Sequence, residues 1–345
     1  MSWSPLSDLG VPLPLVAAPM AGGPSSPELV AAMNGAGALG MVAGGYLSPD
    51  ALAERIAAAR ATGAPFGVNL FVPGPPLDAA SRAAVDRYGS ALAADLEALG
   101  AELGAVPEHD EDAYEDKLAL LLEDPVPLVT TTFALPAADD VSRLRRAGTQ
   151  VWVTVTTPGE ARAAEEAGAN ALVVQGPRAG GHSGTWDPHR TITEESTATV
   201  LRTVALATSL PLIAAGGVDG PEAVRELRAA GATAAAVGTL LLRTVEAGTS
   251  AIHRASLADP RFTTTRVTRA FTGRPARALH SRFVEDHDDE APTAYPVVHH
   301  LTKPLRTAAA AQGDAERVHL WAGTGFRAAR EVPAATVIEE LARDL

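Results

Sequence analysis

Residues 171–184 read Ala-Leu-Val-Val-Gln-Gly-Pro-Arg-Ala-Gly-Gly-His-Ser-Gly, a short apolar run that breaks into a glycine-rich loop. A continuous run of this length predicts a buried strand, and glycines let the backbone behind it approach a ligand closely. Similar strand-to-glycine junctions follow at 213–217 and 235–239. His182 is the only side chain of the loop that can exchange a proton near neutral pH. Three such junctions in succession predict one rim of a barrel that holds a phosphorylated cofactor.

Apolar runs of strand length alternate with helical patterns along most of the chain. They are Leu13–Met20, Leu39–Ala43, Phe66–Phe71, Leu128–Phe133, Val151–Val155, Ala171–Gln175, Leu210–Ala215 and Ala234–Leu240. Most are continuous, as expected for parallel strands covered on both faces. Ser48-Pro49 is a typical helix start, and Gly63 a typical helix end just before a strand. Eight strand–helix units predict an α/β fold, a (β/α)8 TIM barrel; a doubly wound sheet is the alternative, because periodicity does not show closure.

Two segments interrupt this rhythm and lie outside any strand–helix unit. Residues 74–124 are helical in pattern and carry an acidic run at 108–116, typical of a solvated helix surface. Residues 246–315 follow the eighth strand. We expect both insertions, 74–124 and 246–315, to form a smaller, mainly helical lid and substrate region across the C-terminal face. Residues 1–73, 125–245 and 316–345 then form the barrel.

Composition excludes several classes of protein. A net charge of −13 over 345 residues argues against a nucleic-acid or anionic-membrane partner. The absence of cysteine excludes disulfides and thiolate metal sites. The first residues show no signal-peptide pattern, and the longest apolar stretch, 234–242, is too short for a membrane span, so we expect a cytoplasmic protein. Lys117 and Lys303 are the only lysines, a bias that we interpret as genomic composition.

The two later junctions predict a phosphate site. Gly216 and Gly217 follow the seventh strand, and Gly238 and Thr239 follow the eighth, where barrels commonly bind phosphate through backbone N–H groups. A single glycine junction is more simply interpreted as a tight turn, whereas two on consecutive strands favour a ligand. No G-x-G-x-x-G follows an early strand, and neither G-x-x-x-x-G-K-[ST] nor H-E-x-x-H is present. The sequence therefore predicts neither a Rossmann site, a P-loop nor a metal site.

Two carboxamides and the loop histidine are candidates for ligand contact. Asn69 lies within the third strand and Gln175 ends the sixth, positions where an amide must find matched partners. A flavin ring offers such partners, and so does neighbouring backbone. His182 stands out among nine histidines by its place in the rim. For the adjacent His299 and His300 the sequence favours a helix surface, with the alternative that one of them faces the site.

Beyond these arguments, the chain resembles the nitronate monooxygenases, formerly called 2-nitropropane dioxygenases. These are FMN-dependent TIM-barrel enzymes related to the flavin-dependent enoyl-acyl carrier protein reductases. The resemblance covers nearly the whole chain and rests on an ordered set of motifs: Ala17–Gly22, Gly67–Phe71, Gln175–Gly176, Ala179–His182, Ala215–Gly217, Val237–Thr239, Thr272–Arg277 and Leu320–Gly323. The loop departs from the family, which often has Glu-Ala-Gly-Gly-His-Arg-Gly where this chain has Arg-Ala-Gly-Gly-His-Ser-Gly. This departure concerns substrate preference more than flavin binding.

The resemblance implies FMN as cofactor and His182 as the catalytic residue beside the nitro group of the substrate. The residues expected to bind FMN are Met20, Gly22, Asn69, Gln175, Gly180, Gly181, Gly216, Gly217, Ala236, Val237, Gly238 and Thr239. We further expect four residues to line the substrate pocket: Tyr114, Ser183, Tyr295 and Lys303.

The implied reaction is the oxidation of alkyl nitronates, or of nitroalkanes, by O₂ to carbonyl compounds and nitrite, in a monomer or homodimer. Other activities stay open on the same scaffold. One is an FMN- and NAD(P)H-dependent enoyl-thioester reductase, and another is a flavin oxidase acting on a different nitro or amino compound. A flavin-binding sensor or partner subunit without turnover is the non-enzymatic alternative.

Overall fold

A computed structural model of the chain describes residues 4–107, 110–343 and 345. Residues 1–3, on which part of the signal-peptide expectation rests, lie outside the described residues. So do residues 108–109 of the acidic run.

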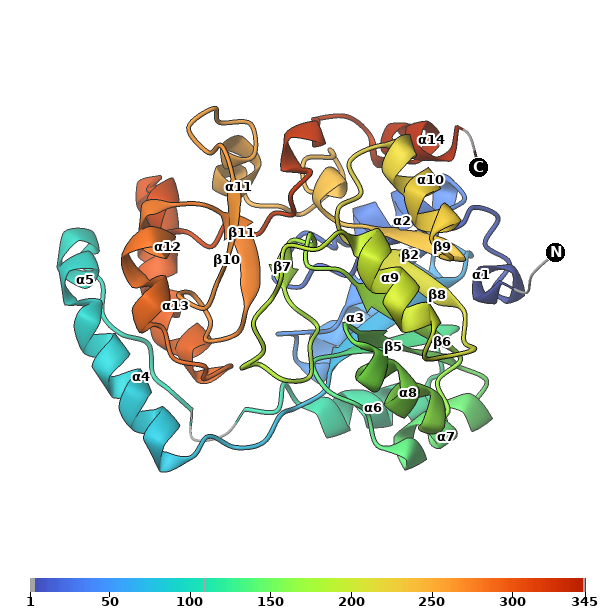
Figure 1. Cartoon of the computed structure of the whole chain (residues 1–345), viewed down its shortest axis with the longest axis horizontal. Helices are drawn as coiled ribbons and strands as arrows, with labels where there is room; N and C mark the ends of the chain where they lie inside the picture. Colours follow the sequence, from blue (N-terminus) through green and yellow to red (C-terminus); the bar gives the residue numbers. More distant parts are fainter. Residues whose placement is uncertain (1–3, 108–109, 344) are drawn as a thin grey trace.

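Eight parallel strands form one sheet, which lies in the right-hand part of the view in Figure 1. They are β1 (Leu15–Ala17), β2 (Gly40–Ala43), β3 (Phe66–Phe71), β4 (Leu128–Thr132), β5 (Gln150–Val155), β6 (Ala171–Gln175), β8 (Leu212–Ala215) and β9 (Ala234–Val237). Their order is β1-β9-β8-β6-β5-β4-β3-β2. The ends of this series meet, because Leu39 N donates to Leu15 O at 2.9 Å and Ala17 N donates to Leu39 O at 2.8 Å. The predicted TIM barrel is confirmed, and this closure excludes the doubly wound sheet.

Each strand is followed by a helix that covers the barrel. These helices are α2 (Pro27–Gly35), α3 (Pro49–Arg60), α6 (Tyr114–Glu123), α7 (Ala138–Arg146), α8 (Pro158–Glu166), α9 (Thr197–Ala205), α10 (Pro221–Ala229) and α14 (Ala334–Ala342). Several begin at the predicted signals. Ser48 Oγ accepts a hydrogen bond from Ala51 N, and Thr157 forms a capping box with Glu160. The short α1 (Pro5–Asp8) contributes Leu6 to the apolar cluster that fills the barrel.

The barrel interior changes character along its axis. Trp152, Met41 and Leu128 belong to one fully buried cluster, so the barrel is a packed core rather than a pore. Towards the carboxyl ends of the strands the side chains become polar. There Asn69 Nδ2 donates to Thr130 Oγ1 at 2.9 Å and to Thr132 Oγ1 at 3.0 Å. This polar end is the one on which a ligand can rest.

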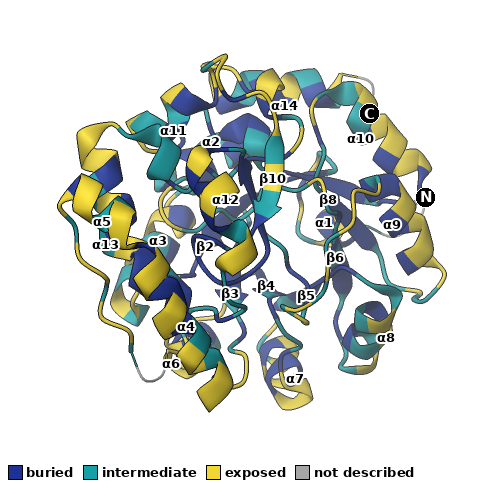
Figure 2. Cartoon of the chain, turned by 60° about the vertical axis from the view of Figure 1, so that its left-hand side comes forward, coloured by how far each residue is buried: buried dark blue, intermediate teal, exposed yellow. Residues whose placement is uncertain are grey.

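A lid stands beside the barrel (Figure 1). It contains α4 (Ala79–Ala91), α5 (Ala93–Leu99), α11 (Ala251–Ser256), α12 (Arg282–His287), α13 (Val297–Gln312) and the antiparallel sheet β10 (Thr265–Thr268)–β11 (Ala276–Leu279)–β7 (Gly181–His182). The two insertions share one apolar core, in which Tyr88 Oη donates to Ala270 O at 2.6 Å. Figure 2 shows the outer faces of α4 and α12 exposed and their inner faces buried. Short 3₁₀ turns complete the chain: η1 (Thr239–Leu241), η2 (Asp288–Glu290), η3 (Ala315–Arg317) and η4 (Phe326–Ala328).

The lid differs from the expected segments in two respects. Helix α6, within residues 74–124, packs Leu118 and Leu121 into the barrel core. Leu320 and Phe326, within the segment assigned to the barrel, pack into the lid core. The lid is mainly helical and also contains the short β10–β11–β7 sheet. Local periodicity identifies an apolar helix face but not the partner that covers it.

Within the described ranges, no helix is long and apolar enough to cross a membrane. The same residues contain no group of three or more His, Cys, Asp or Glu side chains suited to a metal ion.

Candidate active site

The glycine loop is held from both sides. Its tip forms β7, where His182 is the register partner of Ala276 on β11 of the lid. From the barrel side, Gln175 Nε2 donates to His182 O at 3.0 Å, and Gln175 Oε1 accepts from Gly184 N at 2.7 Å. His182 therefore stands at the junction of barrel and lid, on a loop whose main chain is held by hydrogen bonds from both sides.

Three aromatic rings and one hydroxyl surround the imidazole of His182. The ring centroids of Phe133, Tyr295 and Trp321 lie 5.8, 5.4 and 5.2 Å from it. Its Nε2 lies 2.9 Å from Thr272 Oγ1. Burial lowers the pKa of His182 to about 3, with smaller contributions from the positive charges of two arginines. The imidazole is thus neutral at physiological pH and carries one N–H and one lone pair.

Those two arginines, Arg274 and Arg306, are buried without an acidic partner. They are 5% exposed each, and neither forms an ion pair with a carboxylate in the part of the chain that the structure describes. Burial lowers the pKa of each to about 10, so both stay cationic at pH 7. A buried charge without a counter-ion is unfavourable. The site is therefore electropositive and suited to an anion.

Arg274 also shapes the loop that carries His182. Its guanidinium lies 4.1 Å from the centroid of the Phe133 ring. Its Nε donates to Ser183 O at 3.2 Å, and its Nη2 donates to the carbonyl of Thr185. Phe133 itself has a positive φ of 86°, a conformation that side chains larger than glycine rarely adopt. Arg274 thus fastens the loop after β4 to the loop after β6.

An aromatic wall, defined here as Tyr46, Phe71, Phe133, Tyr295 and His299, extends from the barrel rim to the lid. The ring of Tyr46 stacks on His299 at 4.6 Å with 4° between the planes. Tyr295 Oη donates to Tyr46 Oη at 3.1 Å. Phe71 and Phe133 continue the wall with centroids 4.5 Å apart. The wall meets His182 through Phe133 and Tyr295.

The two later glycine junctions form a cradle of unused donors. In the described chain, no acceptor receives a hydrogen bond from the backbone N–H groups of Gly216, Gly217, Gly238 or Thr239. Gly216 and Gly217 have positive φ values of 104° and 77°, which explains the glycines. Thr239 Oγ1 accepts from Gly323 N at 2.9 Å. Free N–H groups at the ends of neighbouring barrel strands fit a phosphate.

The loop backbone approaches the segment Leu320–Gly323 very closely at one glycine. A Cβ added at Gly180 would lie 2.4 Å from Gly323 N and 2.6 Å from the carbonyl carbon of Ala322. Both atoms are main chain and cannot rotate away. The segment Leu320–Gly323 is therefore packed against the loop, and Gly180 is required by that contact.

The two carboxamides have different environments. Asn69 is 3% exposed; the threonines hold its Nδ2, whereas its Oδ1 accepts no hydrogen bond from the described chain. That oxygen is available to an N–H of a ligand above the barrel. Gln175 uses both ends on the glycine loop. Neighbouring groups thus satisfy Gln175 fully and Asn69 only in part.

Most of the other expected cofactor residues surround the same end of the barrel. Met20 lies beside the cradle, since a Cβ added at Gly238 would be 3.9 Å from its Sδ. Ala236 and Val237 are the last residues of β9, directly before the cradle. Gly22 lies in the turn that follows β1, with a positive φ of 84°.

The expected substrate residues are only partly brought together. Tyr295 joins the aromatic wall. Tyr114 does not reach it, because its side chain is buried in the apolar core between α6 and the barrel. Lys303 is exposed on α13. The prediction that His299 lies on a helix surface is wrong, since its ring stacks on Tyr46, whereas the partly exposed His300 pairs with Asp110 at 2.6 Å.

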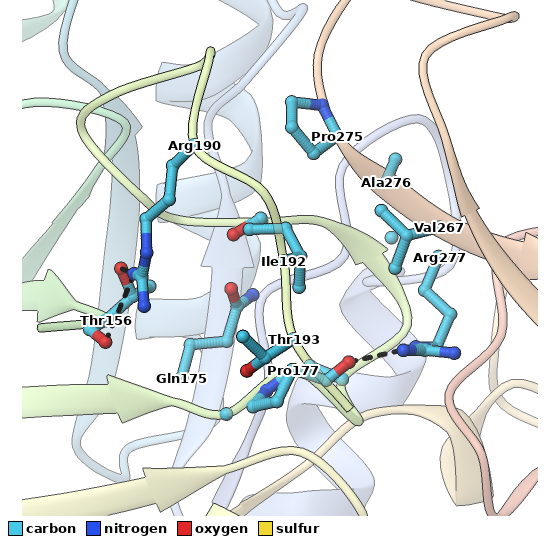
Figure 3. A pocket seen from close by; sticks show the side chains of 14 residues that line it. Thr156, Gln175, Pro177, Arg190, Ile192, Thr193, Val267, Pro275, Ala276 and Arg277 are labelled. Carbon is cyan, nitrogen blue, oxygen red and sulfur yellow. Dashed lines mark hydrogen bonds between the residues drawn. The ribbon is translucent and has the colours of Figure 1, made fainter. Parts of the chain in front are cut away.

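Ser183 lines a separate crevice. Figure 3 shows this crevice with other residues that line it, among them Thr156, Arg190 and Arg277. The crevice is lined by residues on either side of His182 but not by His182 itself. Arg190 Nη1 donates to Thr156 Oγ1 at 2.7 Å and Arg277 Nε donates to Pro177 O at 2.9 Å, so both arginines already have protein partners. The crevice is distinct from the aromatic wall.

Several important residues were not singled out in the sequence: Tyr46, Phe133, Thr272, Arg274, Arg306 and Trp321. Thr272, Arg274 and Trp321 lie within recognised motifs, but nothing local showed that their side chains meet at His182. Arg306 resembles any arginine on an amphipathic helix until the lid buries it.

A closed (β/α)8 barrel that carries free backbone N–H groups, the unpaired Asn69 Oδ1 and the buried His182 at one end is typical of a barrel oxidoreductase that binds a flavin. Comparison with known proteins specifies the family. The model of the nitronate monooxygenase family matches residues 4–344, and the chain belongs to this family.

Individual relatives agree with this assignment. A nitronate monooxygenase of Pseudomonas aeruginosa is 37% identical, over 98% of this chain and 97% of the relative. A probable nitronate monooxygenase of Staphylococcus aureus is 32% identical, over 96% and 94%. Among solved structures, nitroalkane oxidase from Streptomyces ansochromogenes superposes with a TM-score of 0.93 at 48% identity, covering 99% of this chain and 98% of that one. FabK from Thermotoga maritima superposes with a TM-score of 0.76 at 25% identity, covering 99% and 96%.

Proposed function

We propose that this protein uses FMN and O₂ to oxidise alkyl nitronates, the anions of nitroalkanes, to carbonyl compounds and nitrite. The observation that carries the proposal is the pair of buried guanidinium groups, Arg274 and Arg306, near a neutral His182. An anionic substrate supplies the negative charge that these arginines lack. A neutral nitroalkane does not, so the site favours the nitronate.

The cradle supports FMN as the flavin. Its free N–H groups come from two adjacent strand ends and would hold one terminal phosphate. Asn69 Oδ1 would accept from the flavin ring, and Gly180 with Gly181 would give the ring access to the backbone. When bound, the flavin supplies the electron transfer from substrate to O₂.

The protein groups bind and orient the substrate. His182 would donate a hydrogen bond to a nitronate oxygen from the imidazole nitrogen that does not contact Thr272. The other nitrogen, Nε2, lies against Thr272 Oγ1, which orients the ring. The arginines stabilise the anion through a medium of low dielectric constant, where charges interact strongly. The aromatic wall excludes water around the reacting carbon.

Anaerobic titration of the purified holoenzyme tests this proposal. We expect propyl-1-nitronate to bleach the flavin absorbance, and 1-nitropropane and NADPH to bleach it far more slowly. Rapid bleaching by NADPH with none by nitronate would replace the proposal with the enoyl-thioester reductase. His182→Ala should keep FMN and lose turnover by roughly 10- to 150-fold, because a hydrogen bond to a charged group contributes about 1.5–3 kcal/mol. Full turnover in His182→Ala would remove His182 from the mechanism.

A further inference from the structure

Lys117 is a buried ammonium group outside the site described so far. It lies on α6, and its side chain is 1% exposed. Its Nζ lies 2.8 Å from Asp112 Oδ2 and donates to Gly44 O at 3.0 Å. Burying such a pair costs free energy unless its geometry is good and further hydrogen bonds satisfy both groups.

The residue type supports a local requirement. The chain has 28 lysines and arginines, and Lys117 is one of only two lysines. A compact ammonium fits between a carbonyl and a carboxylate where the planar fork of arginine does not. We therefore revise the interpretation that lysine usage reflects genomic composition alone.

The other carboxylate oxygen of Asp112 holds the backbone of Tyr46. Asp112 Oδ1 accepts from Tyr46 N at 2.8 Å. Tyr46 has a φ of 66° and Asp112 a φ of 55°, both in the left-handed region. Side chains other than glycine adopt this region only when the surroundings impose it. The ion pair provides that constraint, because Lys117 binds both Asp112 and the carbonyl of Gly44, two residues before Tyr46.

Tyr46 connects the ion pair to residues on the substrate side of the site. Its ring stacks on His299 of α13, and its hydroxyl accepts from Tyr295. The Tyr295 ring lies 5.4 Å from His182. A continuous series of contacts thus joins the buried ion pair to the histidine without touching the phosphate cradle.

We propose that Lys117 and Asp112 are positioning residues for the nitronate site: their ion pair holds Tyr46 in a left-handed conformation and so places Tyr295 and His299 opposite His182. The inference rests on the proposed function for the identity of the substrate only. Breaking the pair releases Tyr46 and displaces the aromatic wall, while Gly216, Gly217 and Thr239 keep their places.

The test compares Lys117→Met with a matched control, Asp95→Asn. Asp95 joins lid elements through His287 at 2.7 Å and Arg317 at 2.6 Å, and its exposure (13%) is close to that of Asp112 (19%). Measurements are FMN affinity, thermal unfolding and the propyl-1-nitronate concentration that half-saturates anaerobic flavin reduction. We expect Lys117→Met to raise the half-saturating concentration at least fivefold with FMN affinity unchanged within twofold. Asp95→Asn should lower the melting temperature without that shift.

A rescue variant separates charge from positioning. Asp112→Asn combined with Lys117→Met removes both charges but keeps an oxygen that can accept from Tyr46 N. We expect this double variant to recover at least half of the lost nitronate affinity. The proposal is overturned if Lys117→Met shifts nitronate saturation no more than Asp95→Asn, or if the double variant is as impaired as Lys117→Met.

Amide hydrogen exchange does not depend on turnover, so it tests the positioning role even if a variant folds poorly or the substrate is another compound. Amide hydrogen exchange of residues 44–48 should accelerate at least tenfold in Lys117→Met and by a smaller factor in the double variant. It should not accelerate in Asp95→Asn. Unchanged exchange there overturns the positioning role. Failure of the proposed function is seen instead in the wild-type protein, as no bleaching by nitronate.

Discussion

Replacing Thr272 by valine tests whether the hydroxyl beside His182 orients the imidazole. Thr272 is 1% exposed, and its Oγ1 lies 2.9 Å from His182 Nε2. Valine keeps the shape but leaves this ring nitrogen without its partner. An unpaired buried polar group costs about 1–3 kcal/mol. If about 1–2 kcal/mol of this cost is added to the activation free energy, kcat/KM for nitronate falls roughly 5- to 30-fold.

The assay is steady-state nitronate oxidation together with urea unfolding of the same preparations. Thr244→Val is the control, since Thr244 is fully buried and its Oγ1 donates to Leu241 O at 2.8 Å, away from His182. It should lose stability by a similar amount and keep its kcat/KM. Thr272→Ser, which retains the hydroxyl, should recover most of the activity. A Thr272→Val enzyme with kcat/KM within twofold of wild type would refute the orienting role.

Two further predictions concern the cofactor and acid stability. Gly180→Ala should weaken FMN binding at least tenfold, because the added Cβ meets main-chain atoms of Gly323 and Ala322; fluorescence titration with FMN measures this, and wild-type affinity would contradict it. Burial lowers the pKa of His182 to about 3 and of His253 to about 4, so the unfolded state binds protons first as the pH falls. Stability is then complete above pH 6.5 and falls below it by up to about 1.4 kcal/mol per pH unit for each histidine. Urea unfolding at pH 7.5, 6.0 and 5.0 measures the slope, and equal stability at all three would show that these histidines titrate normally.

Strand and cradle positions follow from local signals. Most of the eight runs, such as the one that contains Ala234–Val237, are covered on both faces and are therefore continuously apolar. The junctions at Gly216 and Gly217 were recognised because left-handed backbone selects glycine. Helix starts such as Ser48 were recognised from capping, which involves only residues three positions apart.

Side-chain encounters across the lid did not follow from such signals. Tyr114 and Lys117 are neighbours on α6, yet the tyrosine enters an apolar core while the lysine reaches Asp112 and Gly44. His299 and His300 are adjacent, yet only the first stacks on Tyr46. The direction in which each side chain leaves its helix decides these outcomes. A single sequence does not show which partner will cover each face of the helix.

The sequence by itself determined the strand–helix order, the glycine cradle and the position of His182 in a rim loop, because periodicity, capping and backbone freedom are properties of a few consecutive residues. The tertiary structure alone decided that the sheet closes and that two insertions share one lid core. It also decided that Arg274 and Arg306 lose solvent without gaining a carboxylate. Desolvation depends on everything packed around a group, and these packing partners lie as far apart in the chain as Phe133 and Arg274. The charge that prepares the site for an anion is therefore a property of the fold.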